Sequence, residues 1–308
     1  KILCWAYAQG KQVVFAQGTY DPNFPKDVTY LQDLRNKGDM LIVFLEPGLN
    51  PLIPQQERAF MLSAFSCVDY VAMLEKGANN YSPLLAEPMD PPILITGAAR
   101  SGTSLVAGII HLCGAWGGKF VAPSISNPKG FFENRAMREE IVKPYLRLCG
   151  FDPRAQMPLP RPEFLVPWKD LRGQVETILQ GQGYPGGPWF YKDPKIIHLW
   201  PKWREAFPEA KWVLVRRGDE EIISSCLRTT FMRAYSEAEG WATWLNIHKE
   251  RMGEMLVELV PNIMEVWPRM AISGNFGQMQ AMIEWLGLKW NEAAIREFVS
   301  PELWGGRE

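Results

Sequence analysis

The sequence predicts an α/β protein, with a P-loop-type parallel sheet flanked by helices and a small N-terminal Rossmann-like α/β unit. Two observations predict this fold class. Short continuous apolar runs, typical of parallel strands covered on both faces, alternate with segments of helical spacing. A glycine-bearing turn at residues 97–102 also joins one such run to a predicted helix. With 308 residues, 47% of them hydrophobic, the chain can form about two domains.

The first 80 residues have the pattern of a β-α-β-α-β unit. Pro54 is favourable at a helix start, because the N–H that it lacks has no intrahelical partner there. Consecutive strands that are joined by helices form a parallel sheet, so we expect a small three-layer unit. The predicted strands are 13–16, 40–45 and 68–74, and the predicted helices are 26–36 and 54–65.

A proline-rich segment follows this unit. Residues 81–92 contain four prolines, which restrict the backbone and predict a linker between domains of residues 1–80 and 93–308. In the second domain, strands are expected at 92–96 and 211–216, and helices at 103–112, 220–227, 235–260 and 277–286. Residues 115–130 and 153–188 are expected to be loops that face the acceptor.

Charge and composition exclude several classes of protein. The 33 Lys and Arg residues against 34 Asp and Glu give a net charge of -1, so we expect no nucleic-acid partner. The longest clean apolar run, residues 40–45, is far shorter than the ~20 residues that span a bilayer, so no membrane partner is expected. Five scattered cysteines without metal-ligand spacing predict no metal site and suit a cytoplasmic location.

The sharpest local pattern is Gly97-Ala-Ala-Arg-Ser-Gly-Thr-Ser104, between a predicted strand and a predicted helix. Glycines let the backbone turn tightly and point its N–H groups inward, and the helix start adds the positive end of its dipole. The Walker A spacing of Gly97 and Gly102 is kept, but Thr103 occupies the lysine position and Arg100 brings the positive charge earlier. This loop suits one terminal phosphate better than a nucleoside triphosphate.

Five segments, in order, resemble the sulfotransferase family that uses 3′-phosphoadenosine 5′-phosphosulfate (PAPS). Arg217 and Ser225 in the fourth segment are eight residues apart, as in the family's 3′-phosphate strand and helix. The resemblance covers about residues 91–300. The segments are 100–104, 127–133, 191–194, 207–217 with Ser225, and 282–290.

The resemblance implies PAPS as the sulfonate donor and 3′-phosphoadenosine 5′-phosphate (PAP) as the product. The loop would hold the 5′-phosphate, and Arg217 with Ser225 would hold the 3′-phosphate through the planar fork of the arginine. Arg216 with Ser224 keeps the same spacing, so which arginine points inward is open. The expected binding residues are Gly97, Ala98, Ala99, Arg100, Ser101, Gly102, Thr103, Ser104, Arg217 and Ser225.

Three residues are expected to take part in catalysis. The resemblance implies that Lys192 contacts the bridging oxygen of the leaving phosphate and that Arg100 contacts the sulfonate. We expect Glu133 to be the general base, because the preceding Gly-Phe-Phe would bury it and raise its pKa. A role for Glu133 at a helix start is equally open. The rival bases are His111, His198 and His248.

The function expected from the resemblance is transfer of a sulfonate group from PAPS to a hydroxyl or amine by in-line displacement. Two alternatives stay open. A P-loop small-molecule kinase is disfavoured by Thr103 at the lysine position. In a non-catalytic nucleotide-binding scaffold, both domains would have lost their chemistry.

Residues 10–75 resemble the cytidylyltransferase family, especially the nucleotidyltransferase domain of ADP-heptose synthases. The matching segments are 11–21, 30–31, 38–43, 57–58 and 66–71. The family's His-x-x-His pair is replaced here by Phe24 and Asp27. We therefore expect a degenerate, inactive domain that docks, binds a ligand or forms a homo-oligomer.

Overall fold

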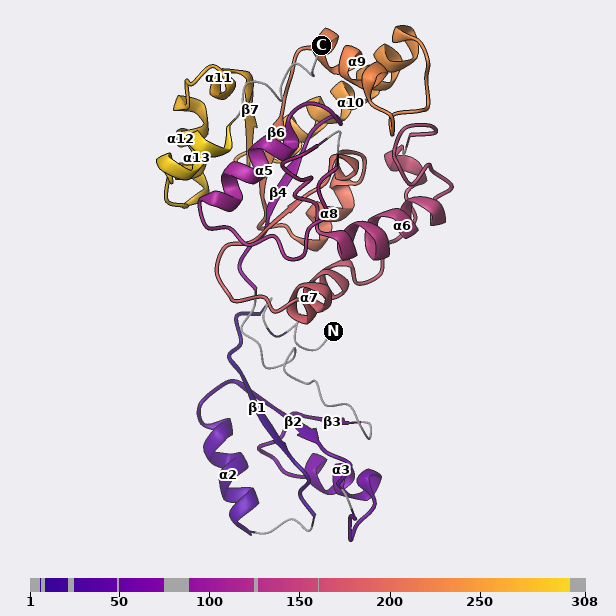
Figure 1. The fold of residues 1–308 in the computed structure, drawn as a ribbon. Helices are drawn as coiled ribbons and strands as arrows, with labels where there is room; N and C mark the ends of the chain where they lie inside the picture. The colour runs from indigo at the N-terminus through magenta and orange to yellow at the C-terminus, as the bar shows by residue number, and fades with distance from the viewer. Residues whose placement is uncertain are drawn as a thin grey trace. The chain divides into compact units, whose positions relative to one another are not determined.

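The computed structural model describes residues 6, 9–21, 25–48, 50–74, 89–124, 127–159 and 161–299. The chain divides into two compact units, Lys1–Glu87 and Pro88–Glu308 (Figure 1). Residues 81–88 of the expected linker lie outside the described residues. The domain boundary that the prolines indicate therefore stays a prediction.

The N-terminal unit is built on a three-stranded parallel sheet. Its strands are β1 (Val13–Gly18), β2 (Met40–Leu45) and β3 (Tyr70–Met73), in the order β1-β2-β3. Helices α2 (Pro25–Arg35) and α3 (Gln55–Ser63) connect them. The predicted succession of strands and helices is therefore confirmed.

Both helices of this unit pack on one face of its sheet. Leu31 of α2 and Leu62 of α3 share a hydrophobic cluster with alternate residues of β2, because two successive right-handed crossovers in one direction place their helices on the same side. The other face of β2 clusters with Ala6 and Leu74. Residues 1–5 and 7–8 lie outside the described residues, so the expected three-layer arrangement of this unit stays a prediction.

The second unit contains a four-stranded parallel sheet. Strands β4 (Ile93–Thr96), β5 (Phe190–Lys192), β6 (Lys211–Val215) and β7 (Ile263–Val266) lie in the order β5-β4-β6-β7. After β4 the chain adds β5 on one side and then β6 on the other. Ligands of open α/β sheets bind at such a reversal of strand order, outside the carboxyl ends of the strands.

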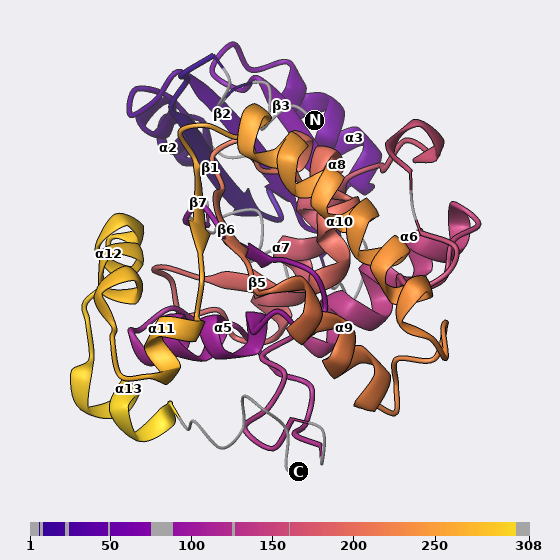
Figure 2. The same cartoon turned by 90° about the horizontal axis from the view of Figure 1, so that it is seen from above.

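Helices cover both faces of this sheet (Figure 2). One face carries α5 (Thr103–Leu112), α11 (Arg269–Ile272), α12 (Gly277–Leu286) and α13 (Glu292–Phe298). The other carries η1 (Met137–Val142), α6 (Lys143–Leu148), α7 (Leu171–Gly181), η3 (Pro194–His198), α8 (Trp200–Ala206), α9 (Asp219–Arg228) and α10 (Ala238–Glu258). The predicted fold class, parallel sheets flanked by helices, is confirmed. Among the described residues, no helix has the length and apolar character needed to cross a bilayer.

One stretch that we expected to be loop is partly helical. Helix α7 lies within residues 153–188 and buries Leu171, Val175 and Leu179 at four-residue spacing. Its start is capped by Asp170, whose carboxylate accepts a hydrogen bond from the N–H of Gly173. The short 3₁₀-helix η2 (Pro162–Phe164) lies in the same stretch.

Two buried histidines join η3 to α10. Nδ1 of His248 lies 2.8 Å from the carbonyl oxygen of Trp244, so this nitrogen carries the proton. Nε2 of His248 then accepts from Nε2 of His198, 3.0 Å away. Burial lowers the pKa of His248 to about 4, and burial with the nearby charges lowers the pKa of His198 well below its usual value.

This pair predicts a loss of stability in mild acid. The unfolded chain binds protons at histidine below about pH 6.5 and the folded pair does not, so the free energy of unfolding falls as the pH drops below 6.5. We expect His248 to account for a loss of about 2 kcal/mol between pH 7 and pH 5. Urea denaturation at both pH values measures the loss, and the variant His248→Gln should reduce it. An equal loss in the variant would contradict this assignment.

Candidate active site

The loop between β4 and α5 turns close to the sheet. A Cβ atom at Gly97 would lie 2.4 Å from the carbonyl oxygen of Val215, so only glycine fits there. Arg100 and Gly102 have φ angles of 73° and 99°, in the left-handed region. For a non-glycine residue such as Arg100 this conformation is strained, and strain of this kind is concentrated at functional sites. Left-handed residues in a turn are typical of anion-binding backbone nests, so this turn is a candidate phosphate site.

Arg217 and Ser225 meet this loop at Arg100. Nη1 of Arg217 donates to the carbonyl oxygen of Arg100 at 3.0 Å. Nε of Arg100 donates to Oγ of Ser225, also at 3.0 Å. The structure therefore brings together the loop and the arginine–serine couple, which lie more than a hundred residues apart in the sequence.

The alternative couple, Arg216 and Ser224, makes other contacts. Nη1 of Arg216 lies 2.8 Å from a carboxylate oxygen of Glu265, and Oγ of Ser224 accepts a hydrogen bond from Arg228. Arg217 is thus the arginine of this pair that reaches the loop. Burial lowers the pKa of its guanidinium against the opposing effect of Glu221, and the group stays charged at neutral pH.

The loop lines a pocket of about 190 Å³. The polar side chains of the lining are those of Arg100, Thr103, Ser104, Asn127, Lys129, Glu133, Lys192 and Arg217. Four phenylalanines and an isoleucine form much of the apolar lining: Phe131, Phe132, Phe231, Phe298 and Ile272. All three residues that we expected to be catalytic therefore face one space.

Some of the expected binding residues lie behind the pocket wall. Ala99 and Gly102 line the pocket, whereas Ala98 and Ser101 are fully buried and do not. Ser225 is buried as well and reaches the pocket only through its contact with Arg100. In the part of the chain that the structure describes, no three His, Cys, Asp or Glu side chains gather in a way that could hold a metal ion.

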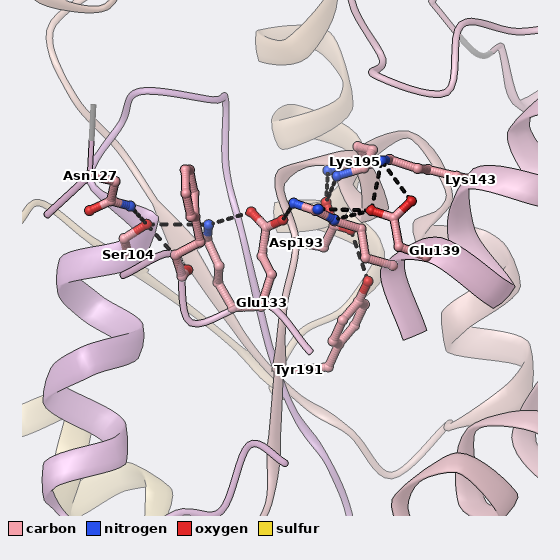
Figure 3. Close-up of polar contacts among 11 residues, drawn as sticks. Ser104, Asn127, Glu133, Glu139, Lys143, Tyr191, Asp193 and Lys195 are labelled. Carbon is pink, nitrogen blue, oxygen red and sulfur yellow. Dashed lines mark hydrogen bonds and ion pairs between the residues drawn. The ribbon is translucent and has the colours of Figure 1, made fainter. Parts of the chain in front are cut away.

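Lys192 and Glu133 form a buried ion pair at the pocket. Nζ of Lys192 lies 2.8 Å from Oε1 of Glu133, and the two side chains are 3% and 7% exposed. The same ammonium donates to Oγ of Ser104 at 3.4 Å. Oε2 of Glu133 lies 3.1 Å from Nη1 of Arg138. Figure 3 shows this run of polar contacts, with Asn127 and Ser104 at one end and Glu139 and Lys143 at the other.

The expected direction of the Glu133 pKa shift is wrong. Burial by itself raises the pKa of this carboxyl, as we expected. The positive charges of Lys192, Lys195 and Arg138 outweigh that effect and lower the pKa to about 2. Glu133 is therefore ionised at neutral pH and is a weak base as long as it is paired with Lys192. Its contacts are with cations and not with the N–H groups of a helix start.

Asp193 fixes the chain directly after Lys192. Its carboxylate accepts from the hydroxyl of Tyr191 at 2.8 Å, and from the backbone N–H and Nζ of Lys195 at 2.9 and 2.7 Å. Its carbonyl oxygen accepts from Oγ1 of Thr96, at the end of β4. Asp193 does not line the pocket, but these contacts fix the backbone next to Lys192.

None of the three histidines lines the pocket. His198 and His248 contact each other, and Nδ1 of His111 lies 3.1 Å from the carbonyl oxygen of Ala115. The geometry therefore gives no support to a histidine as the base.

The sequence left several site residues unassigned. Asn127 donates to Oγ of Ser104 at 3.1 Å, and Arg138 holds the outer oxygen of Glu133. Asn127 stands in segment 127–133, whose resemblance to the family was a usable signal. Phe298 belongs to α13 and lies beside Gly108 of α5, where a Cβ atom would come 2.3 Å from its ring. No local pattern could have placed it at the pocket.

The sequence profile described as "Sulfotransferase family" matches residues 91–292, and the chain belongs to that family. Among solved structures, sulfotransferase STF9 of Mycobacterium avium superposes with a TM-score of 0.47, at 14% identity over 72% of this chain and 70% of that chain. The sulfotransferase domain of the olefin synthase of Synechococcus PCC 7002 gives 0.44, at 15% identity over 71% and 80%.

A different set of relatives matches the N-terminal region. The bifunctional protein HldE of Geobacter sulfurreducens is 38% identical over 106 residues, which are 31% of this chain and 21% of that protein. HldE of Syntrophotalea carbinolica is 35% identical over 108 residues, 32% and 21% of the two chains. The chain thus spans about a fifth of the length of these curated relatives. The resemblance of this region to a cytidylyltransferase-like domain is confirmed.

Proposed function

We propose that this sulfotransferase takes its sulfonate group from PAPS and transfers it to a hydroxyl or amine. The observation that carries the proposal is the meeting of loop 97–104, Lys192 and Arg217 around one pocket where the strand order reverses. The loop offers N–H groups and a helix start to a 5′-phosphate. Arg217 offers a planar fork to a second phosphate.

The proposed reaction is an in-line displacement at sulfur. The acceptor oxygen or nitrogen forms a new bond to sulfur, and the bond from sulfur to the 5′-phosphate oxygen breaks. PAP leaves with the electron pair of that bond, and the proton of the acceptor passes to Glu133. Lys192 and Arg100, which both line the pocket, would stabilise the charge on the leaving phosphate and on the sulfonate oxygens.

The test is ligand-dependent thermal stability without added Mg²⁺, followed by an assay of sulfonate transfer. We expect PAP to raise the Tm, since a ligand at 100 times its Kd adds about 2.7 kcal/mol to the free energy of unfolding. ATP with Mg²⁺ should give a much smaller shift. Stabilisation by ATP with Mg²⁺ and not by PAP would favour a kinase instead. PAP binding without transfer to any acceptor in a broad panel would favour a scaffold.

We propose that the N-terminal unit is inactive as a nucleotidyltransferase. Asp27 stands where the family has its second histidine, while Phe24, at the first position, lies outside the described residues. Arg58, fully buried, binds the carbonyl oxygens of residues 19, 46, 47 and 53. These bonds hold together the loops that follow β1 and β2, so the unit would keep its shape as a docking, ligand-binding or oligomerisation module.

We propose a cytoplasmic location on the chemistry of the cysteines. Within the described residues Cys67, Cys113, Cys149 and Cys226 are free thiols, which suits a reducing compartment.

A further inference from the structure

We propose that Glu133 and the donor compete for Lys192. Before PAPS binds, the carboxylate holds the lysine; when it binds, the 5′-phosphate takes the lysine over and leaves Glu133 free to accept the proton of the acceptor. The inference rests on the proposed function and adds to it a coupling between donor binding and the availability of the base.

The positions of the three groups allow this exchange. Nζ of Lys192 is 2.8 Å from Glu133 and 3.4 Å from Oγ of Ser104, in the first turn of α5. A phosphate held by the loop N–H groups would lie beside Ser104. The ammonium can therefore move from carboxylate to phosphate by a change in its own side chain, with β5 in place.

Burial makes the contacts exclusive. Both side chains are almost completely removed from water, and an unpaired charge there is costly. Lys192 needs one anion at all times, and in the unliganded protein that anion is Glu133. When the lysine leaves, Glu133 still has Arg138 at its other oxygen, 3.1 Å away. The exchange moves no proton and breaks no covalent bond.

The exchange changes the basicity of Glu133. Lys192 is the strongest of the cations that hold its pKa near 2. Once Lys192 pairs with a phosphate, fewer positive charges counteract the effect of burial on Glu133. The pKa of its carboxyl then rises, and Glu133 becomes a better base. A donor-free enzyme thus has its base blocked, and the base becomes available when the donor is bound.

The decisive experiment is calorimetric titration of PAP into the Glu133→Gln variant. Because glutamine is neutral and of similar shape, it releases Lys192 for the phosphate, and we expect PAP to bind about tenfold more tightly than to the parent protein. The Tm of the unliganded variant should fall, since Lys192 loses its partner, and sulfonate transfer should be lost. A pair with a purely structural role would give the lower Tm without tighter binding.

Glu139→Gln is the matched control. It makes the same change of charge, but Glu139 contacts Arg138 and Lys143 and not Lys192. PAP affinity in this variant should stay within about twofold of the parent value. Equal tightening in both variants would show a general charge effect and overturn the proposal.

The remaining outcomes separate the two claims. If PAP binds the parent protein but binds Glu133→Gln no more tightly, the competition is wrong and the proposed function stands. If PAP binds neither, the proposed function itself fails. Should Glu133→Gln not fold, Arg138→Met tests the same idea in the opposite direction. Glu133 then holds Lys192 more strongly and PAP binds several-fold more weakly, whereas unchanged affinity would overturn the proposal.

Discussion

Replacing Lys192 with methionine is expected to lower the rate of sulfonate transfer by about 10²–10³-fold. Methionine keeps the buried apolar stem but has no charge to stabilise the leaving phosphate. PAP affinity should change by less than about tenfold, because Lys192 gives up one anionic partner, Glu133, to contact another. Transfer rates under donor saturation, together with PAP titrations, measure the two effects separately.

Lys249→Met is the control for this substitution. Lys249 is exposed and pairs with Asp219 on the surface, so the same chemical change there should leave the transfer rate close to that of the parent. If Lys192→Met kept more than about a tenth of the parent rate, Lys192 would not have the role that we assign to it.

Replacing Arg217 with alanine is expected to weaken PAP binding by at least about a hundredfold, because it removes two hydrogen bonds to a charged group, each worth about 1.5–3 kcal/mol. This decrease in affinity should come from the lost contacts with the 3′-phosphate. Adenosine 5′-phosphate, which lacks that group, should therefore bind the variant and the parent with more similar affinities. The variant also loses the hydrogen bond from Arg217 to the carbonyl oxygen of Arg100. We therefore expect an additional, smaller decrease in affinity that is the same for both nucleotides.

Arg216→Ala provides the matched comparison, because Arg216 is the adjacent arginine and pairs with Glu265 instead. It should leave the ratio of the two affinities unchanged. If the ratio of PAP affinity to adenosine 5′-phosphate affinity fell in Arg216→Ala and was unchanged in Arg217→Ala, Arg216 and not Arg217 would bind the 3′-phosphate.

The sequence predicts the sheet and the loop well, because both depend on local chemistry. Residues 40–45 and 212–215 are continuous apolar runs, and each lies in a parallel strand and is buried. Helix α5 was expected at 103–112 and has those bounds, since the glycine turn fixes where it begins. The meeting of Arg217 with the loop could also be expected, because parallel strands end at the same edge of a sheet.

The sequence does not predict features that depend on charges and packing contacts from distant parts of the chain. The Phe-Phe before Glu133 correctly indicates burial, but nothing local shows that Lys192, Lys195 and Arg138 converge on the carboxylate. The sign of its pKa shift was therefore wrong. In the N-terminal unit, α2 and α3 pack on the same face of the sheet. The direction of the crossovers decides this, and no single residue encodes it.

A crystal structure of the protein with PAP tests the central claim most directly. The proposed function predicts the 5′-phosphate on the N–H groups of residues 98–104 and the 3′-phosphate on the guanidinium of Arg217. Nζ of Lys192 should then lie nearer to the 5′-phosphate than to Glu133. PAP bound away from this pocket, or a pocket that stays empty at saturating PAP, would contradict the assignment of the site.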